Sequence, residues 1–546
     1  MLSRLLQSFR MRNLPGLSRR DLFRGGGLMA AAGLFEGSVQ SAAADAGLRI
    51  GPDIYQSIGV HPIINCKGTF TIISGSLSLP EVKQAMDAAS RHYIHLDELM
   101  DAVGKRLAEI TGAEFGVVTA GCAAALTHAT AACIAGADPE KLQRLPYLEG
   151  LKNEVLVPRY SRNVYDHAVR MLGVKIVEAD NLDEFEKAFN ERTAMVMVLA
   201  SPPDSGPFGL EPICRIARLK RVPVLVDAAA EKLTIPNVHL QRGAHLVAYS
   251  GGKCLRGPQC AGVLLGQKDL VKAAWLHSAP HHAFGRSLKV GKEEIMGMLA
   301  AVEMWVKRDH DAEWRQWESW LDEIAGQVTK VDGVTTDVLQ PSGLSNYAPQ
   351  LRIKWEGEKI GITGREMEKI LWEEEPRIIL SGASGDYRDN MASSIVIMPY
   401  MMTPGDAQVA GKRFRELLEK PPRVERKRNT DPPVQISGQW DVHMEFFCGS
   451  GEHSLVFEQK GSELVGTHSG DILSGDLRGT MEGNEVRFRS SHKYEGTRLG
   501  YRFEGKVDGD IMRGTVDMEE YGVAQWTAHR HTYGRPGGIV RPQKNV

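Results

Sequence analysis

The 546-residue chain has no excess of basic residues, because 66 Lys and Arg stand against 68 Asp and Glu, a formal net charge of −2. Proteins that bind nucleic acid need positive patches to neutralise phosphates, so we predict no nucleic-acid partner. The seven cysteines are scattered and odd in number, which argues against a disulfide framework, and no Cys-x-x-Cys pair indicates a metal site. We therefore predict buried free thiols and no bound metal.

A candidate export signal occupies residues 1–46. Ser18-Arg19-Arg20-Asp21-Leu22-Phe23-Arg24 resembles the twin-arginine motif, and a short apolar stretch and Ala42-Ala43-Ala44 follow it. The apolar stretch is much shorter than the ~20 residues that cross a bilayer, so the mature chain is expected to have no membrane span. We predict a periplasmic or secreted protein. A chance basic terminus or an organelle signal is the alternative.

Alternating helix and strand patterns indicate an α/β fold. With 42% hydrophobic and 25% charged residues, the chain is typical of a soluble globular protein with more than one domain. Strands are expected at residues 115–119, 154–158, 175–178, 194–199, 223–226, 246–249 and 262–265. Because helical segments separate most of these runs, we predict a mostly parallel sheet with helices on both faces.

Two polar residues follow neighbouring strands of this series. Asp227 ends the run Val224-Leu225-Val226, and Lys253 follows Tyr249-Ser250-Gly251-Gly252. Ligands of such sheets gather at the carboxyl ends of strands, so both side chains are expected in one site. A lysine that forms a Schiff base and a carboxylate that keeps a pyridine nitrogen protonated are what pyridoxal 5′-phosphate chemistry requires. We predict Lys253 and Asp227 as the catalytic pair; a solvated lysine and a capping aspartate are the alternatives.

Further residues are candidates for holding this cofactor. Gly121, Cys122 and Ala123 form a small-residue turn between a strand and a helix, where backbone N–H groups and the helix dipole favour a phosphate. Ser250 is expected to add a hydroxyl to the same phosphate. His167 is predicted to stack its ring on the pyridine, with Tyr165 as the alternative.

The region from about residue 58 to 327 resembles the fold-type I pyridoxal phosphate enzymes of the selenocysteine synthase-like group, particularly the D-glucosaminate-6-phosphate ammonia-lyase branch. The matching segments are Ile64-Asn65-Cys66-Lys67-Gly68-Thr69, Val118-Thr119-Ala120-Gly121-Cys122-Ala123-Ala124, residues 145–155, Arg162-Asn163-Val164-Tyr165-Asp166-His167, Val226-Asp227-Ala228-Ala229, Ser250-Gly251-Gly252-Lys253 and Lys289-Val290-Gly291-Lys292-Glu293-Glu294. The resemblance implies Lys253 as the Schiff-base lysine, Asp227 as the pyridinium partner and a homodimer or higher oligomer. Cys66 and Cys122 stand where the family is expected to have small residues such as alanine or serine.

The substrate is predicted to be an amino acid or amino-sugar acid. Arg286 and Arg377 are candidate partners of its carboxylate, because the planar guanidinium matches a carboxylate best; ordinary surface arginines are the alternative. Removal of the Cα proton followed by β-elimination would release ammonia and a 2-keto acid. A racemase, aldolase or aminotransferase of the same fold stays open.

The C-terminal third follows different patterns. Residues 331–419 are expected to form a small α/β domain after the cofactor-binding domain of residues 47–330. A charged, proline-bracketed linker at 420–435 marks a boundary. From 436 to 532 the period is two, with hairpin signals such as Lys460-Gly461, which predicts an antiparallel, lipocalin-like barrel before a tail at 533–546. A non-catalytic protein that binds a ligand in this barrel is the alternative to an enzyme.

Overall fold

The computed structural model describes residues 47–387, 390–423 and 432–532. The expected export signal, the C-terminal tail and most of the expected linker lie outside these ranges. The chain divides into two units, Met1–Pro62 and Ile63–Val546. The described part of the first unit contains the 3-10 turn η1 (Gln56–Ile58). All elements below belong to the second unit.

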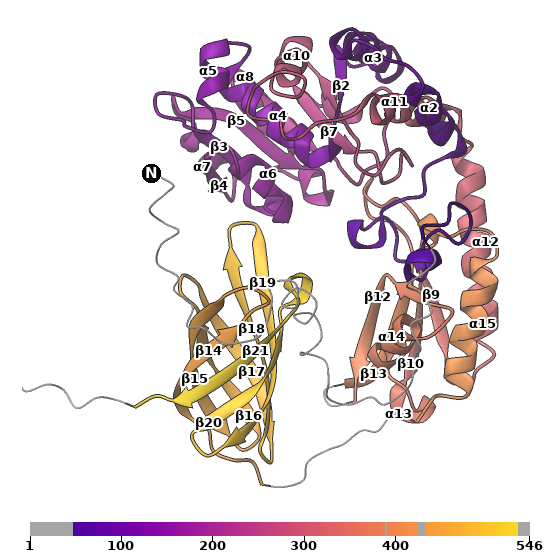
Figure 1. Ribbon diagram of the computed structural model, residues 1–546, viewed down its shortest axis with the longest axis vertical. Coiled ribbons are helices and arrows are strands. Elements are labelled where there is room, and N and C mark those ends of the chain that lie inside the picture. Colours follow the sequence, from indigo (N-terminus) through magenta and orange to yellow (C-terminus); the bar gives the residue numbers. More distant parts are fainter. Residues whose placement is uncertain (1–46, 388–389, 424–431, 533–546) are drawn as a thin grey trace, which may run out of the picture. The chain divides into compact units, whose positions relative to one another are not determined.

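A seven-stranded sheet, covered by helices, carries the first hydrophobic core of this second unit (Figure 1). Its strands, in spatial order, are β2 (Phe115–Thr119), β8 (Gly262–Gly266), β7 (Leu246–Ser250), β6 (Val224–Asp227), β5 (Thr193–Leu199), β3 (Glu154–Pro158) and β4 (Lys175–Ala179). Strand β8 runs antiparallel to both of its neighbours, and the other pairs are parallel. The prediction of a mostly parallel sheet is confirmed.

Burial on both faces explains the composition of these strands. The side chains of β2, β3, β6 and β8 are all buried, and β5 reads Thr-Ala-Met-Val-Met-Val-Leu without a charge. Helix α4 (Gly121–Ala135) contacts β5, β6, β7 and β8. The other helices of this part of the chain are α2 (Pro80–Ser90), α3 (Leu96–Thr111), α5 (Pro139–Arg144), α6 (His167–Arg170), α7 (Leu182–Ala188), α8 (Leu210–Leu219), α9 (Val238–Gln241), α10 (Lys268–Leu276) and α11 (Lys292–Lys307).

A second hydrophobic core is built around a four-stranded antiparallel sheet in the order β12-β13-β10-β9. These strands are β9 (Thr335–Leu339), β10 (Gln350–Glu356), β12 (Gly382–Asp386) and β13 (Asn390–Ile397), and the helices are α12 (His310–Val328), α13 (Gly357–Ile360), α14 (Gly364–Glu373) and α15 (Asp406–Glu419). Strands β1 (Ile64–Cys66) and β11 (Ile378–Leu380) pair separately in parallel. A capping box between Thr363 and Glu366 satisfies the first N–H groups of α14 and so fixes where that helix begins.

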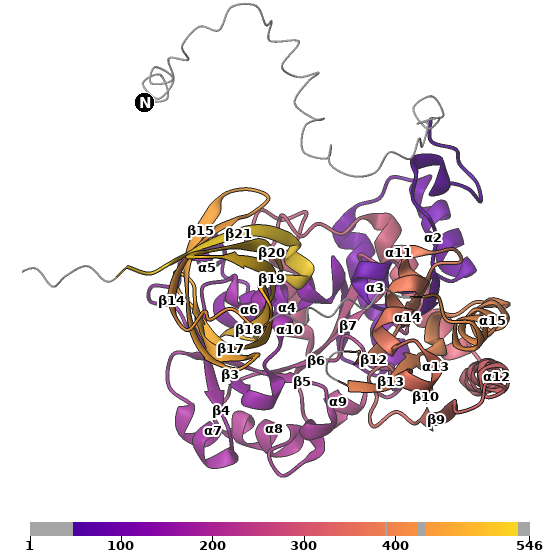
Figure 2. The same cartoon turned by 90° about the horizontal axis from the view of Figure 1, so that it is seen from below.

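The C-terminal strands close into an antiparallel barrel, as predicted (Figure 2). They are β14 (Gly438–Glu445), β15 (Ser450–Lys460), β16 (Glu463–Ser469), β17 (Ser474–Glu482), β18 (Glu485–Tyr494), β19 (Thr497–Asp508), β20 (Ile511–Asp517) and β21 (Val523–Arg530). Each pairs with the next, and β14 pairs with β21. Alternate residues of β18 are buried, which is the pattern of a strand with one face toward a packed interior. Trp440 and Trp526 are the largest side chains in this core.

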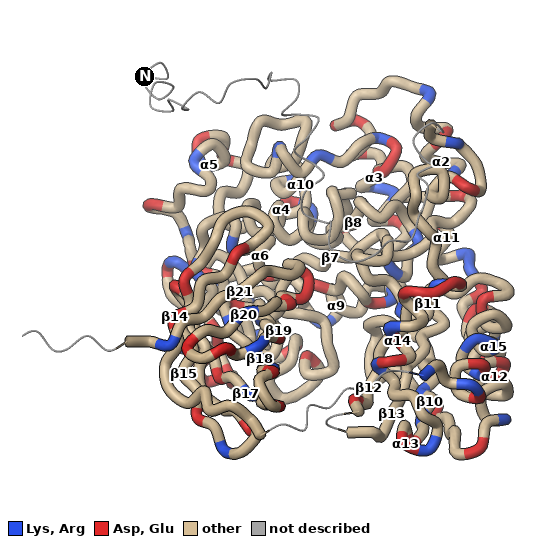
Figure 3. Tube along the Cα trace, turned by 60° about the horizontal axis from the view of Figure 1, so that its bottom comes forward, with Lys and Arg blue, Asp and Glu red and all other residues tan. Residues whose placement is uncertain are grey.

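Charged residues of both signs are interspersed along the chain rather than gathered by sign (Figure 3). On α15, for example, Lys412 pairs with Glu416 and Arg415 with Glu419, each one helical turn apart. Among the described residues, no helix is long and apolar enough to cross a membrane.

Candidate active site

The strand register brings the predicted site residues to one edge of the seven-stranded sheet. Asp227 is the last residue of β6 and lies beside Ala248 of β7. Ser250 ends β7 and lies beside Gly262, which in turn lies beside Thr119 at the end of β2. Helix α4 begins two residues after Thr119. The carboxyl ends of three strands and the start of α4 therefore meet, as parallel sheets with bound ligands require.

Asp227 is a buried carboxylate, with only 3% of its surface exposed. Its Oδ1 accepts hydrogen bonds from the Ala229 N–H at 3.2 Å and the Cys122 thiol at 3.7 Å. Burial raises the pKa of Asp227, while the Ala229 N–H and the charge of Lys253 act in the opposite direction. Asp227 forms no ion pair with any described basic side chain.

Lys253 follows β7 in a turn that only small residues permit. A Cβ on Gly252 would lie 2.8 Å from the Cα of Gln259, closer than real contacts allow. The half-buried Lys253 side chain lies within electrostatic reach of Asp227, since its charge lowers the pKa of that carboxyl. Its Nζ also lies 5.9 Å from the centre of the Tyr165 ring.

The start of α4 forms an open cradle for an anion. Gly121 has a φ of +83°, and a Cβ there would meet no atom within 4 Å, so the space in front of it is empty. A Cβ on Gly262 would lie 2.5 Å from the backbone of Gly121, which shows how closely β8 approaches the turn. Gly121 and Ala123 are accessible, Cys122 is buried and Ser250 is half-buried.

These residues fit pyridoxal phosphate. The first turn of the 15-residue helix α4 offers free N–H groups to a phosphate. The lysine amine can reach an aldehyde at the same strand ends, and Asp227 offers the buried negative charge that a protonated pyridine nitrogen would neutralise. The chain thus supplies one group for each polar end of the cofactor.

The two ring candidates lie in different surroundings. His167 is exposed, and its Nδ1 lies 3.4 Å from Nη2 of Arg170. Tyr165, the alternative, is the ring beside Lys253. The segment that carries both is anchored by Asp166, which is fully buried and accepts hydrogen bonds from Arg162 at 2.7 Å and Arg170 at 3.0 Å. The geometry favours Tyr165, and stacking by His167 stays a prediction.

Neither candidate substrate arginine contacts the catalytic pair. Arg286 is exposed in the loop after α10. Arg377 precedes β11, where its guanidinium stacks on Trp372 with 4.1 Å to the ring centre and its Nε donates to the Trp372 carbonyl at 2.9 Å. Both roles stay predictions.

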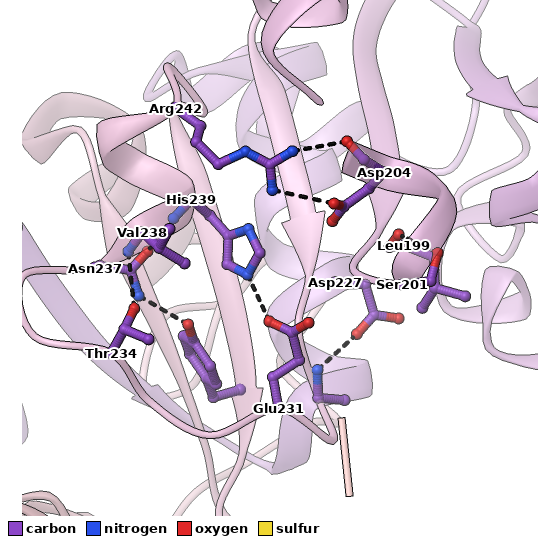
Figure 4. A network of polar contacts seen from close by, with 12 residues as sticks. Leu199, Ser201, Asp204, Asp227, Glu231, Thr234, Asn237, Val238, His239 and Arg242 are labelled. Atoms are coloured by element: carbon purple, nitrogen blue, oxygen red, sulfur yellow. Dashed lines mark hydrogen bonds and ion pairs between the residues drawn. The ribbon is translucent and has the colours of Figure 1, made fainter. Parts of the chain in front are cut away.

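Sequence reasoning missed a buried acid–base pair next to Asp227. Glu231 and His239 are 4% and 1% exposed, and Nε2 of His239 lies 2.6 Å from Oε2 of Glu231 (Figure 4). The sequence feature that could have indicated this pair is the glutamate directly after the apolar run that ends in Ala228-Ala229-Ala230. Within residues 47–387, 390–423 and 432–532, no group of three or more His, Cys, Asp or Glu is arranged to hold a metal ion.

Comparison with known proteins agrees with this site. No family model matches the chain. The chain is 28% identical to D-glucosaminate-6-phosphate ammonia lyase of Salmonella typhimurium (strain 14028s / SGSC 2262) over 331 residues, which is 59% of this chain and 87% of that protein. It is also 28% identical to 5′-C-glycyluridine monooxygenase-decarboxylase of a Streptomyces species, over 67% of this chain and 92% of that protein.

A solved structure and a further sequence relative are similar to the chain as well. A solved structure of D-glucosaminate-6-phosphate ammonia-lyase matches with a TM-score of 0.59 and 27% identity, covering 67% of this chain and 98% of the other. L-seryl-tRNA(Sec) selenium transferase of Proteus mirabilis (strain HI4320) is 25% identical over 46% of this chain and 58% of that protein. With its sheet topology, its lysine–aspartate pair and these similarities, the chain is a pyridoxal phosphate-dependent enzyme of fold type I, similar to the selenocysteine synthase group.

Proposed function

We propose that this chain is an exported lyase that releases ammonia from an amino acid or amino-sugar acid and leaves a 2-keto acid. The observation that carries the proposal is the meeting of Lys253, Asp227 and the open start of α4 at one edge of the sheet. Similarity to an ammonia lyase over most of that protein's length favours elimination. The monooxygenase-decarboxylase relative has the same identity, so the reaction must be tested directly.

The chain's own groups divide the work. Bound pyridoxal phosphate supplies an electron-withdrawing ring that acidifies the substrate Cα–H. The first N–H groups of α4 would hold the phosphate, and Asp227 would accept a hydrogen bond from the ring nitrogen. Lys253 anchors the cofactor and then carries a proton on its Nζ, taken from the substrate carbon. Burial of Asp227 excludes water from that end of the site and so strengthens its electrostatic effect.

An absorption experiment tests the cofactor and its lysine together. The purified protein is expected to show a visible band after addition of pyridoxal phosphate, and Lys253→Ala is expected to lack that band. Lys268→Ala is the matched control, because Lys268 is exposed at the start of α10. A wild-type chain without a visible band after cofactor addition would exclude the proposed chemistry.

Ammonia and 2-keto acid assays with a panel of amino and amino-sugar acids test the reaction. Equal amounts of both products, absent with Lys253→Ala, are expected for one class of substrate. Racemised or transaminated product without ammonia would assign the chain to a different reaction of the same fold. Product from none of the panel, despite a bound cofactor, would favour a protein that holds a ligand without converting it.

Export is part of the proposal and is supported by the Arg19-Arg20 motif. We expect the mature chain in the periplasm or outside the cell, loaded with cofactor. Arg19→Lys with Arg20→Lys should keep the precursor in the cytoplasm, as measured by cell fractionation. We also propose a homodimer or higher oligomer, which light scattering of the purified protein tests.

A further inference from the structure

A second buried carboxylate lies close behind Asp227. Glu231 follows Asp227 by four residues, in the loop between β6 and α9, and only 4% of its surface is exposed. Figure 4 shows its carboxylate directed at the ring of His239, which lies on α9. The 2.6 Å contact between them is the only polar contact made by the Glu231 side chain within the described residues.

The proton of this pair can be placed from its hydrogen bonds. Nδ1 of His239 is buried and has no hydrogen-bond partner among the described residues. A protonated imidazole would carry an N–H at that atom, and burying such an N–H without an acceptor is costly. His239 is therefore neutral, with its proton on Nε2 donated to Glu231. The pair then carries one negative charge.

Among the described residues, no Lys or Arg forms an ion pair with Glu231 that would cancel that charge. Arg242, one turn further along, is held by Asp204 at 3.1 Å and by Glu211 at 3.6 Å, so its charge is already compensated. Lys232 points to the Tyr347 ring, 3.8 Å from its centre. Of the remaining groups nearby, the Cys254 thiol donates to the Glu231 carbonyl, and the Tyr249 hydroxyl accepts from Asn237.

The charge of Glu231 is also poorly screened. The pair lines a cavity of about 540 Å³, but only 5% of the Glu231 side chain and 1% of the His239 side chain are exposed. Asp227 responds to it, since burial first and the charge of Glu231 in addition raise the pKa of Asp227. Two buried carboxylates four residues apart thus follow β6, and the charge of Lys253, the residue that the cofactor would engage, opposes their effect on the pKa of Asp227.

We propose that Glu231, oriented by His239, is a positioning residue that acts through Asp227 to favour a protonated cofactor ring. The inference rests on the proposed role of Asp227. A ring cation is attracted by both carboxylates, so it binds more tightly and loses its proton at higher pH than with Asp227 alone.

Glu231→Gln tests the charge while keeping an acceptor for the His239 N–H. We expect cofactor affinity, measured by quenching of tryptophan fluorescence, to fall about tenfold, and the pH titration of the bound cofactor's absorbance to move about one unit lower. His239→Gln keeps both a donor and the Glu231 charge, so its titration should match wild type. Should Glu231→Gln not fold, as judged by circular dichroism, Glu231→Gln with His239→Gln makes the same charge change with two matching amides.

Glu154→Gln is the matched control. Glu154 is also a buried carboxylate of the sheet, 5% exposed, but it begins β3 and is paired with Arg192 at 2.9 Å. The proposal is overturned if Glu231→Gln titrates and binds cofactor as Glu154→Gln does while Asp227→Asn is impaired. If Asp227→Asn also matches wild type, the proposed assignment of the site fails with it.

Discussion

The thiol of Cys122 lies 3.7 Å from Oδ1 of Asp227, although the two residues are 105 positions apart in the chain. The contact joins the first turn of α4 to the end of β6, the two elements that are proposed to hold opposite ends of the cofactor. Burial raises the pKa of Cys122 well above its ordinary value, and the charge of Asp227 adds to the effect. A helix N-terminus usually lowers the pKa of a thiol and makes it reactive, but here burial and the charge of Asp227 outweigh that effect.

We predict that Cys122 is unreactive in the native protein. Brief alkylation followed by peptide mass spectrometry should label Cys260 and Cys448, which are exposed. The other five cysteines should react only after unfolding, because each is buried or half-buried. Rapid labelling of Cys122 in the native chain would show that this turn is open and that the hydrogen bond to Asp227 is absent.

Replacing Asp227 with Asn should stabilise the cofactor-free protein while impairing the enzyme. Burial raises the pKa of Asp227 in the folded state above the ordinary 3.8, so the folded state binds its proton more tightly than the unfolded state. The free energy of unfolding then falls as pH rises from about 3.8 through the folded pKa. An Asn at position 227 does not titrate, so the free energy of unfolding of the variant does not fall over this pH range. Its stability advantage over wild type should therefore be fully present above the folded pKa of Asp227.

Urea unfolding of the cofactor-free proteins at pH 5 and pH 8 measures this effect. At pH 8 we expect Asp227→Asn to be more stable by about 1–2 kcal/mol, with an advantage no larger at pH 5. With saturating cofactor the order should reverse, because only the carboxylate attracts a ring cation. A cofactor-free Asn variant that is less stable at both values would contradict the assigned burial.

Tyr165 should matter more than His167 for cofactor binding. The Tyr165 ring lies beside Lys253, whereas His167 is directed to Arg170. Tyr165→Ala is expected to weaken cofactor affinity about 3- to 10-fold, the usual worth of an aromatic contact, and Tyr165→Phe much less. His167→Ala should stay within twofold by the same fluorescence assay. A larger loss with His167→Ala would restore the histidine as the stacking ring.

The central sheet was predictable because its strands are buried on both faces. Runs such as 194–199 and 246–249 are continuous, apolar and bounded by polar residues, and they agree within one residue with β5 and β7. The positions of Asp227 and Lys253 were predictable for the same reason, since a charged residue that ends such a run, or follows it after a short turn, lies at the carboxyl end of the strand.

Contacts made across the sheet were not predictable from local patterns. The pairing of β8 antiparallel to β2 and β7 depends on the whole topology, and it places Gly262 against Gly121. The Glu231–His239 pair requires that a four-residue helix, α9, turns back toward the loop before it. In α9, two apolar residues flank His239, and this pattern does not indicate toward which part of the protein the histidine side chain points.

The barrel contains a further cluster, in which histidines of β15, β16 and β18 meet. His468 is fully buried, its Nε2 lies 2.8 Å from Nδ1 of His453, and its Nδ1 lies 2.6 Å from the Ser490 hydroxyl. The carbonyl of His468 lies 3.0 Å from Nε2 of His492. Burial first, and the neighbouring histidines in addition, lower the pKa of His468 to about 2.

We predict that this cluster makes the barrel sensitive to acid. Because the folded pKa of His468 lies below the ordinary 6.5, the unfolded state binds the proton more tightly, and stability falls as pH drops from about 6.5 toward about 2. His468→Gln should therefore unfold at a lower pH than wild type in tryptophan fluorescence, whose signal includes the buried Trp440 and Trp526. The control His529→Gln removes an exposed histidine of β21 and should leave the acid midpoint unchanged. Equal midpoints for wild type and His468→Gln would mean that the cluster is protonated without cost, and that its burial is incomplete in solution.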